Sequence, residues 1–311
     1  MKKSVIVIVL LFLFSYSFCQ DIYELKNDYV QIKVKKTGAE LCGIKLLSNG
    51  KDYMWNGNPK VWGGFSPVLF PIVGVIKDDS YFFEGKKYTM SIHGFFQRNP
   101  NVTLKLTTDS SLTFALKYNE ETLKKYPFEF EFLITYTLRK SKVVITHEVQ
   151  NLGSKDMYFS TGGHPSFKCP MEAGEKYSDY YLEFDKAETA NTYPIGANGL
   201  LDKKADLILN NSRVINLNYH MFDKGALVFK DIKSRKVCLC SKISGKRVEV
   251  DYEGFPYIGF WAMPNADYIC IEPWLGINDS ANTNQDIKTK EGILKLSGNS
   301  TFKAAYSISV F

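Results

Sequence analysis

Three short segments of this chain combine a titratable side chain with residues that restrict the backbone. His93 lies in the segment SIHGFF, His164 in STGGHPSF and Glu272 in CIEPWLG. Pro165 directly follows His164 and restricts that histidine toward extended geometry. An imidazole and a carboxylate on constrained backbone are suited to proton transfer near neutral pH, because their pKa values are readily tuned to that range. We therefore interpret His164, Glu272 and His93 as candidate acid–base or binding residues.

Each of these residues also has a structural interpretation. A lone histidine at the end of a strand is often buried and hydrogen-bonded, and Glu272 could form a salt bridge with a strand lysine. A carboxylate after an apolar segment is nevertheless unfavourable to bury without a partner or a task. Of the chain's four histidines, His147 lies in an alternating segment and is predicted to be a solvated sheet residue, and His220 has no supporting segment.

Two of the four tryptophans are also candidates for the site. Trp274 is two residues after Glu272, and Trp62 lies in the segment VWGG. Aromatic rings near carboxylates and histidines are typical of sugar sites, although a place in the core is the alternative for each ring.

Motifs for nucleotide phosphates, for a zinc protease or for a serine hydrolase are absent. Cys238 and Cys240 should share one face of a strand, but they lack a second ligand pair at zinc spacing, so we expect no metal site.

The segments that must position these residues are strands. Period-two alternation or short apolar runs, separated by turn residues, predict strands at 29–34, 102–106, 128–138, 143–149, 226–229 and 248–252. The single helical candidate is short, at about 119–125. No alternation of strands and helices indicates a parallel sheet. We therefore predict an all-β protein with one large antiparallel domain at 21–311.

The amino terminus and the composition bear on the cellular location and on the partners of the protein. Lys2 and Lys3 precede an uncharged apolar segment shorter than a membrane-spanning helix needs, which predicts a signal peptide at 1–20 and a secreted or periplasmic protein without stable membrane insertion. A lipidated Cys19 and an uncleaved anchor are the alternatives. A disulfide among the remaining five cysteines is possible in an exported protein, but no pairing can be assigned. The net charge of +6 is spread thinly, so no nucleic-acid partner is expected.

Four segments, in order, resemble the aldose 1-epimerase (galactose mutarotase-like) superfamily, and most closely its LacX-like branch. They are SPVLFPIVG from Ser66, HGF from His93, GGHPSF from Gly162 and CIEPWLG from Cys270, with Asp279 just after. Together they span most of the chain after the predicted signal peptide. The resemblance implies a large antiparallel β-sandwich, which agrees with the strands predicted above.

The resemblance also implies an activity without metal or other cofactor: interconversion of the α and β anomers of a free monosaccharide. In such enzymes the histidine corresponding to His164 is the general acid on the ring oxygen. The glutamate corresponding to Glu272 is the general base on the C1 hydroxyl. His93 would bind and polarise the sugar, with Trp274 and Arg98 as further substrate contacts.

This chain departs from its relatives at three positions of the resemblance. Gln97 and Val75 stand where relatives often carry arginine, and Gly225 stands where an aspartate that contacts the sugar is expected. The missing arginines favour a neutral sugar over a phosphorylated one. The three departures also leave a second hypothesis open, a carbohydrate-binding protein on the same fold that has lost turnover.

Overall fold

The computed structural model describes residues 22–311 except 197, 202–206 and 231. The signal peptide predicted at 1–20 therefore lies outside the described residues, and so does Cys19. Within the described part, strands dominate and α1 (Glu120–Lys125) is the one α-helix. The side chain of Asn119 caps it by accepting a 2.9 Å hydrogen bond from the Thr122 N–H, as expected for a helix N-cap. No described helix has the length and apolar character to cross a membrane.

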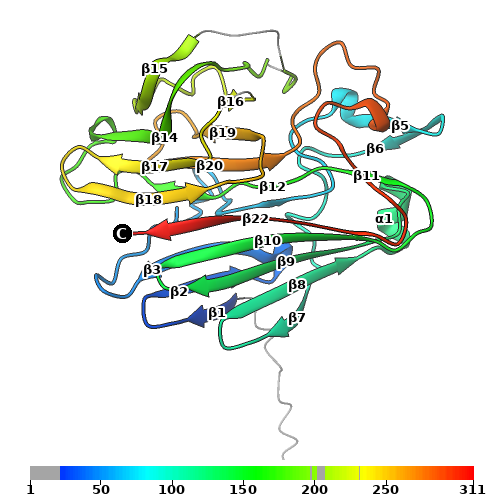
Figure 1. Cartoon of the computed structure of the whole chain (residues 1–311), viewed down its shortest axis with the longest axis horizontal. Coiled ribbons are helices and arrows are strands. Elements are labelled where there is room, and N and C mark those ends of the chain that lie inside the picture. Colours follow the sequence, from blue (N-terminus) through cyan, green and yellow to red (C-terminus); the bar gives the residue numbers. More distant parts are fainter. Residues whose placement is uncertain (1–21, 197, 202–206, 231) are drawn as a thin grey trace, which may run out of the picture.

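Two large antiparallel sheets form the body of the protein (Figure 1). The nine strands of the first sheet are, in spatial order, β15 (Leu207–Asn216), β14 (Tyr180–Asn191), β17 (Lys236–Ser241), β18 (Gly245–Asp251), β22 (Thr301–Val310), β10 (Lys142–Asn151), β9 (Phe130–Arg139), β8 (Ser111–Lys117) and β7 (Thr103–Thr107). The six strands of the second are β16 (Leu227–Phe229), β19 (Tyr257–Trp261), β20 (Tyr268–Leu275), β12 (Thr161–Gly163) and β4 (Val68–Leu69), with β13 (Ser166–Lys168) also paired to β20.

Smaller elements complete the structure. The strands β1 (Ile22–Lys26), β2 (Val30–Lys35) and β3 (Glu40–Leu46) form a three-stranded sheet. Two-stranded ladders join β5 (Ser80–Phe83) to β6 (Lys86–Thr89) and β11 (Met157–Phe159) to β21 (Leu294–Leu296). Short 3₁₀ helices occur at Thr37–Ala39, Lys77–Asp79, Tyr177–Asp179 and Ile287–Thr289. The all-β antiparallel sandwich predicted from the sequence is confirmed.

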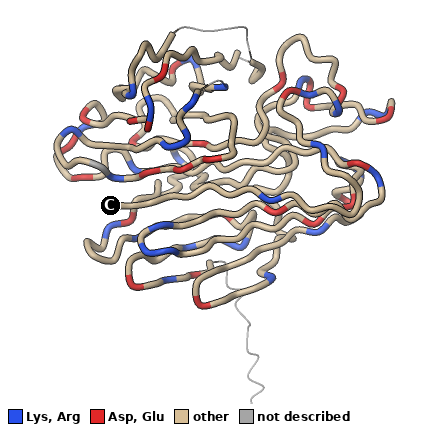
Figure 2. Tube along the Cα trace, viewed as in Figure 1, with Lys and Arg blue, Asp and Glu red and all other residues tan. Residues whose placement is uncertain are grey.

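The core lies between the two large sheets, where aromatic side chains from both meet. Phe184 of β14 packs edge-on against Phe260 of β19, with ring centroids 5.9 Å apart. Phe70, next to β4, stacks on Phe132 of β9 at 4.4 Å. Burying large aromatic rings is a principal source of stability in such a core. Charged residues of both signs are interspersed along the rest of the chain (Figure 2).

His147 belongs to this core and not to the solvent, so the prediction of a solvated sheet residue is wrong. Its side chain on β10 is fully buried, in phase with Val143, Ile145 and Val149. Nδ1 lies 2.7 Å from the Thr161 hydroxyl, which itself donates to the carbonyl of Leu69. Because that hydroxyl has one hydrogen, Nδ1 of His147 must be the donor. The bond ties the nine-stranded sheet to β12.

We expect His147 to make the fold sensitive to acid. Burial lowers its pKa to about 3, below the ordinary value near 6.5 that the unfolded chain has, so the unfolded state binds the extra proton first. Stability is therefore present above about pH 6.5 and is lost as the pH falls toward the folded pKa, by about 1.4 kcal/mol per pH unit. Urea unfolding of wild type and His147→Gln between pH 7 and 5 should show a shallower decline for the variant.

The exposed His220 provides the control, because its side chain is 80 % accessible. His220→Gln should follow the wild-type decline closely. Parallel curves for wild type and His147→Gln would contradict the prediction, whatever the absolute stability of the variant.

Candidate active site

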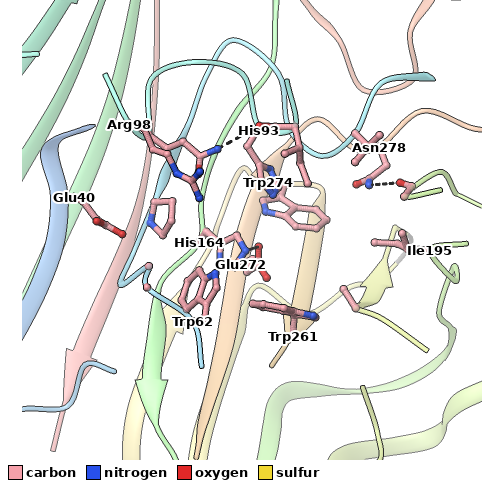
Figure 3. Close-up of a pocket in the computed structure, with 18 of the residues that line it drawn as sticks. Glu40, Trp62, His93, Arg98, His164, Ile195, Trp261, Glu272, Trp274 and Asn278 are labelled. Atoms are coloured by element: carbon pink, nitrogen blue, oxygen red, sulfur yellow. Dashed lines mark hydrogen bonds and ion pairs between the residues drawn. The ribbon is translucent and has the colours of Figure 1, made fainter. Parts of the chain in front are cut away.

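The pairing of β20 with β12 and β13 brings His164 opposite Glu272. Gly162 pairs with Trp274 on one side, and Ser166 pairs with Cys270 on the other, in one continuous antiparallel register. His164 falls midway between the two pairs and therefore lies across from Glu272. Its Nε2 is 3.2 Å from Oε2 of Glu272 (Figure 3).

Two glycines make this approach possible. A Cβ at Gly163 would lie 2.2 Å from the Tyr306 hydroxyl, and one at Gly162 would lie 2.9 Å from the Pro273 carbonyl. Neither contact is sterically allowed, so side chains are excluded at both positions. The strand β12, which leads into His164, can consequently lie tightly against β20 of its own sheet and against β22 of the nine-stranded sheet.

Burial dominates the electrostatics of the pair. His164 is 8 % exposed and Glu272 is 1 % exposed. Removal from water lowers the pKa of His164 to about 3, and the neighbouring His93 acts in the same direction. Burial raises the pKa of Glu272 well above its ordinary value. Each shift favours the neutral form of its group, so burial alone favours a proton on Glu272 over one on His164, and two such groups in contact titrate as one unit.

His93 approaches the pair from a strained turn. Its φ is +61° and that of Gly94 is +75°. A Cβ on Gly94 would lie 2.3 Å from the Phe70 carbonyl oxygen, so only glycine fits there. Nδ1 of His93 accepts a 3.1 Å hydrogen bond from the Gly74 N–H, which places the proton of the neutral ring on Nε2. Burial lowers the His93 pKa to about 4, although part of the side chain is open to the cavity.

All five residues predicted for the site line one cavity of about 670 Å³, although their roles stay predictions. These residues are His164, Glu272, His93, Trp274 and Arg98. Trp274 is only 2 % exposed, so it forms the wall, whereas Arg98 is exposed at the rim. The three departures from the family pattern also line the cavity: Val75, Gln97 and Gly225.

Two further tryptophan rings surround His164. Trp62 stacks on it with ring centroids 5.2 Å apart, and Trp261 meets it edge-on at 5.9 Å. Both rings are partly exposed and line the cavity. Their flat faces offer apolar surface next to the polar pair, as Figure 3 shows.

Sequence reasoning missed Glu40, a buried carboxylate in the wall of the cavity. Oε1 accepts hydrogen bonds from the N–H groups of Phe65 at 2.7 Å and Ser66 at 3.2 Å. Burial raises the pKa of Glu40, and these N–H groups and Lys35 oppose the shift. The carboxylate thereby anchors the loop that carries Trp62. No local motif marked it, because its partners come from a distant loop.

Asp279 belongs to the segments that resemble the family. It stabilises the cavity rim on the side of Asn278. Its Oδ1 lies 2.9 Å from Nζ of Lys290, with both side chains 5 % exposed. Oδ2 accepts a 3.0 Å hydrogen bond from the Lys77 N–H. Desolvation lowers the pKa of Lys290, and Asp279 opposes the shift. The pair thus joins three distant segments beside Asn278 and Val75 of the cavity wall.

The described cysteines lie in different parts of the fold: Cys42 is on β3 of the three-stranded sheet, Cys238 and Cys240 are on β17, Cys270 is on β20 and Cys169 directly follows β13. Cys42, Cys169 and Cys270 are free thiols. The sulfur atoms of Cys238 and Cys240 lie 3.0 Å apart, so the two side chains share one face of β17 as predicted.

Comparison with known proteins shows the family of this chain. The sequence model described as aldose 1-epimerase matches residues 21–281. The chain belongs to the aldose 1-epimerase family. Within it, the chain is similar to the plasmid-encoded protein LacX of Lactococcus lactis subsp. lactis, with 35 % identity over 298 residues that cover 92 % of this chain and 98 % of the relative.

Solved structures of the family share the fold. The galactose mutarotase related enzyme of Lactobacillus acidophilus superimposes with a TM-score of 0.88 at 33 % identity, covering 93 % of this chain and 97 % of that one. A galactose mutarotase-like protein of Lactobacillus casei gives 0.87 at 28 % identity, with 93 % and 100 % covered. The predicted membership of the aldose 1-epimerase family, close to LacX, is confirmed.

Proposed function

We propose that this aldose 1-epimerase family member is a mutarotase that interconverts the α and β anomers of a free, neutral aldose. The observation that carries the proposal is the buried contact of His164 with Glu272 at 3.2 Å beside the tryptophan rings. The C1 hydroxyl and the ring oxygen share one carbon. Two proton-transfer groups this close together can therefore each reach one of them.

The reaction needs one transferable proton shared by the pair. His164 donates its proton to the ring oxygen as the C1–O5 bond breaks, and Glu272 removes the C1 hydroxyl proton as the C1=O bond forms. Rotation about C1–C2 and closure on the other face reverse both transfers, so the pair regains its starting state. Burial favours the neutral forms of both groups in the free protein, so the proton must pass from Glu272 to His164 to reach the reactive arrangement. In that arrangement imidazolium and carboxylate are in contact, and each offsets the unfavourable burial of the other's charge.

The remaining groups of the cavity would hold the sugar. The Nε2–H of His93 can donate to a sugar oxygen, since Nδ1 is already bonded to Gly74. The rings of Trp62 and Trp261 can pack on the C–H face of a pyranose. The proposed export of the protein rests on residues 1–20 alone and would place this reaction outside the cytoplasm.

Polarimetry tests the proposal. Freshly dissolved α-D-glucose and α-D-galactose, followed by a panel of other aldoses, should reach rotational equilibrium faster with the protein than with buffer. Acceleration of at least one neutral aldose is expected. If every sugar of the panel relaxes at the buffer rate, the protein is not a mutarotase for these sugars.

A specific observation favours a second candidate, a carbohydrate-binding protein without turnover. Val75, Gln97 and Gly225 all line the cavity at positions where relatives offer charged sugar contacts. Calorimetry separates the two functions. Heat of sugar binding without any change in the polarimetric rate would support the binding protein, and binding together with acceleration would support the enzyme.

A further inference from the structure

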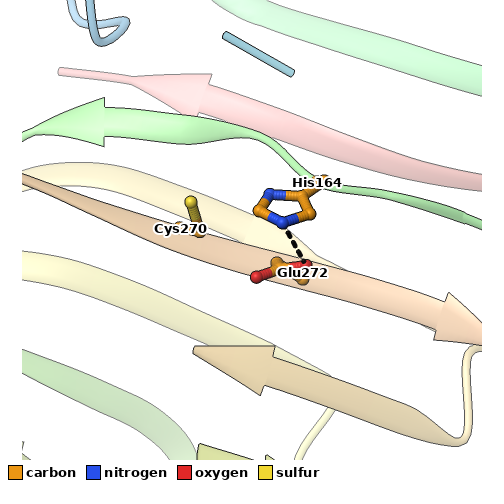
Figure 4. A group of neighbouring side chains, drawn as sticks. All are labelled: His164, Cys270 and Glu272. Atoms are coloured by element: carbon orange, nitrogen blue, oxygen red, sulfur yellow. Dashed lines mark ion pairs between the residues drawn. The ribbon is translucent and has the colours of Figure 1, made fainter. Parts of the chain in front are cut away.

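Cys270 places a thiol directly beside the acid–base pair. It precedes Glu272 by two residues on β20, so both side chains project from the same face of the strand. One sulfur, one ring nitrogen and one carboxylate oxygen from Cys270, His164 and Glu272 lie within 4.8 Å of one another, and all three residues are buried (Figure 4). Apart from the 3.2 Å approach of His164 Nε2, Oε2 of Glu272 has no hydrogen-bond partner among the described residues.

The separation between the imidazole and the carboxylate is close to that between two ligands of a tetrahedral metal ion. Zinc–nitrogen and zinc–oxygen bonds of about 2.0–2.2 Å place two such ligands about 3.3–3.5 Å apart. The observed distance between Nε2 of His164 and Oε2 of Glu272 is 3.2 Å. A thiolate bound at about 2.3 Å would lie about 3.6 Å from each of them. The cluster spans at most 4.8 Å, so the Cys270 sulfur would have to move by up to about 1.2 Å to complete three bonds.

The chemistry of the donors selects the kind of ion. Imidazole and thiolate favour zinc and similar transition metals, whereas calcium and magnesium prefer oxygen ligands. A divalent ion that displaces the protons of the thiol and the carboxyl leaves the buried cluster without net charge. His164 and Glu272 line the cavity, so the fourth coordination position would face it.

We propose that His164, Cys270 and Glu272 form a binding site for a divalent transition-metal ion of the zinc type, and that the bound ion inhibits the protein. Inhibition follows because the metal occupies the atoms that transfer protons. That second part rests on the proposed mutarotase function, whereas metal binding does not. The ion has no part in the sugar reaction itself.

The metal site can be tested with Co²⁺ as a spectroscopic probe and Zn²⁺ in calorimetry, using the chelator-treated full protein. We expect one equivalent to bind, with a thiolate-to-cobalt absorption band. Cys270→Ser should abolish the band and weaken Zn²⁺ binding about tenfold or more, since even supporting residues of metal sites contribute that much. His164→Gln, which leaves the thiol in place, should weaken binding as well and serves if Cys270→Ser does not fold.

Cys238 and Cys240 supply the matched control, because their two sulfur atoms are close enough to each other to bind one ion. The Cys238→Ser/Cys240→Ser double variant should bind Co²⁺ as the wild type does. A sulfur band that persists in Cys270→Ser, or that disappears in the double variant, would overturn the proposal.

The inhibition is measured separately by polarimetry. Micromolar Zn²⁺ should slow anomer interconversion by the wild type, and Cys270→Ser should need about tenfold more Zn²⁺ to lose half of its own metal-free rate. Equal inhibition of both proteins would refute the assigned site. If no aldose is accelerated at all, the mutarotase proposal fails, while the cobalt and calorimetric results still decide the metal site.

Discussion

Replacing Glu272 by glutamine is expected to lower kcat/KM for anomer interconversion by about 10²–10⁴-fold while the protein stays folded. The amide has nearly the same shape but cannot accept the C1 hydroxyl proton. It also removes a carboxyl that burial holds far from its ordinary pKa, so the midpoint of urea denaturation should be equal to that of wild type or higher. Polarimetry and denaturation of the same preparation measure both effects.

Glu188→Gln is the matched control, because Glu188 is a buried carboxylate, 4 % exposed, that bonds Ser234 away from the cavity. This variant should keep the wild-type rate. The assignment of Glu272 as the base would be abandoned if Glu272→Gln retained more than about a tenth of wild-type kcat/KM.

Breaking the Asp279–Lys290 pair is expected to have the largest effect on stability. Asp279→Asn keeps an acceptor for the Lys77 N–H but leaves the Lys290 ammonium buried without its counter-charge. Removing one partner of such a pair destabilises by about 3–5 kcal/mol. Lys290→Met should be similarly damaging, because it leaves the Asp279 carboxylate buried. Urea unfolding of each variant at pH 7 measures the loss.

The double variant Asp279→Asn/Lys290→Met decides whether the loss reflects the pair. Neither charge is then present, and the hydrogen bond from Lys77 can persist, so most of the stability should return. Losses that simply add in the double variant would show that the two residues act independently. In that case the cavity rim beside Asn278 would not depend on the interaction between Asp279 and Lys290.

The strand pattern was readable from the sequence because alternation reports burial on one face of a sheet. The segment at 128–138 corresponds to β9 and that at 143–149 to β10. The same alternation could have placed His147 correctly, since it has the parity of Val143, Ile145 and Val149. A polar residue in a strand is expected to face solvent. The sequence does not show that Thr161, which accepts the hydrogen bond from the His147 N–H, lies across the sandwich.

The two central residues of the candidate site could also be predicted from the sequence, but the residues around them could not. Glycine and proline next to His164, and proline after Glu272, gave local signals for both residues. Glu40 and Lys290 gave none. Each is stabilised by partners that only the folded chain brings near, and a single sequence does not specify those pairings.

The pairing of β12 and β13 with β20 determines when His164 and Glu272 come together during folding. His164 and Glu272 are 272 − 164 = 108 residues apart along the chain, and they meet only through this pairing. Closing so long a loop is slow compared with forming local hairpins such as β9–β10. We therefore expect the pair to form at a late step. If the proposed function holds, partly refolded chains with most of their strands formed would still be inactive.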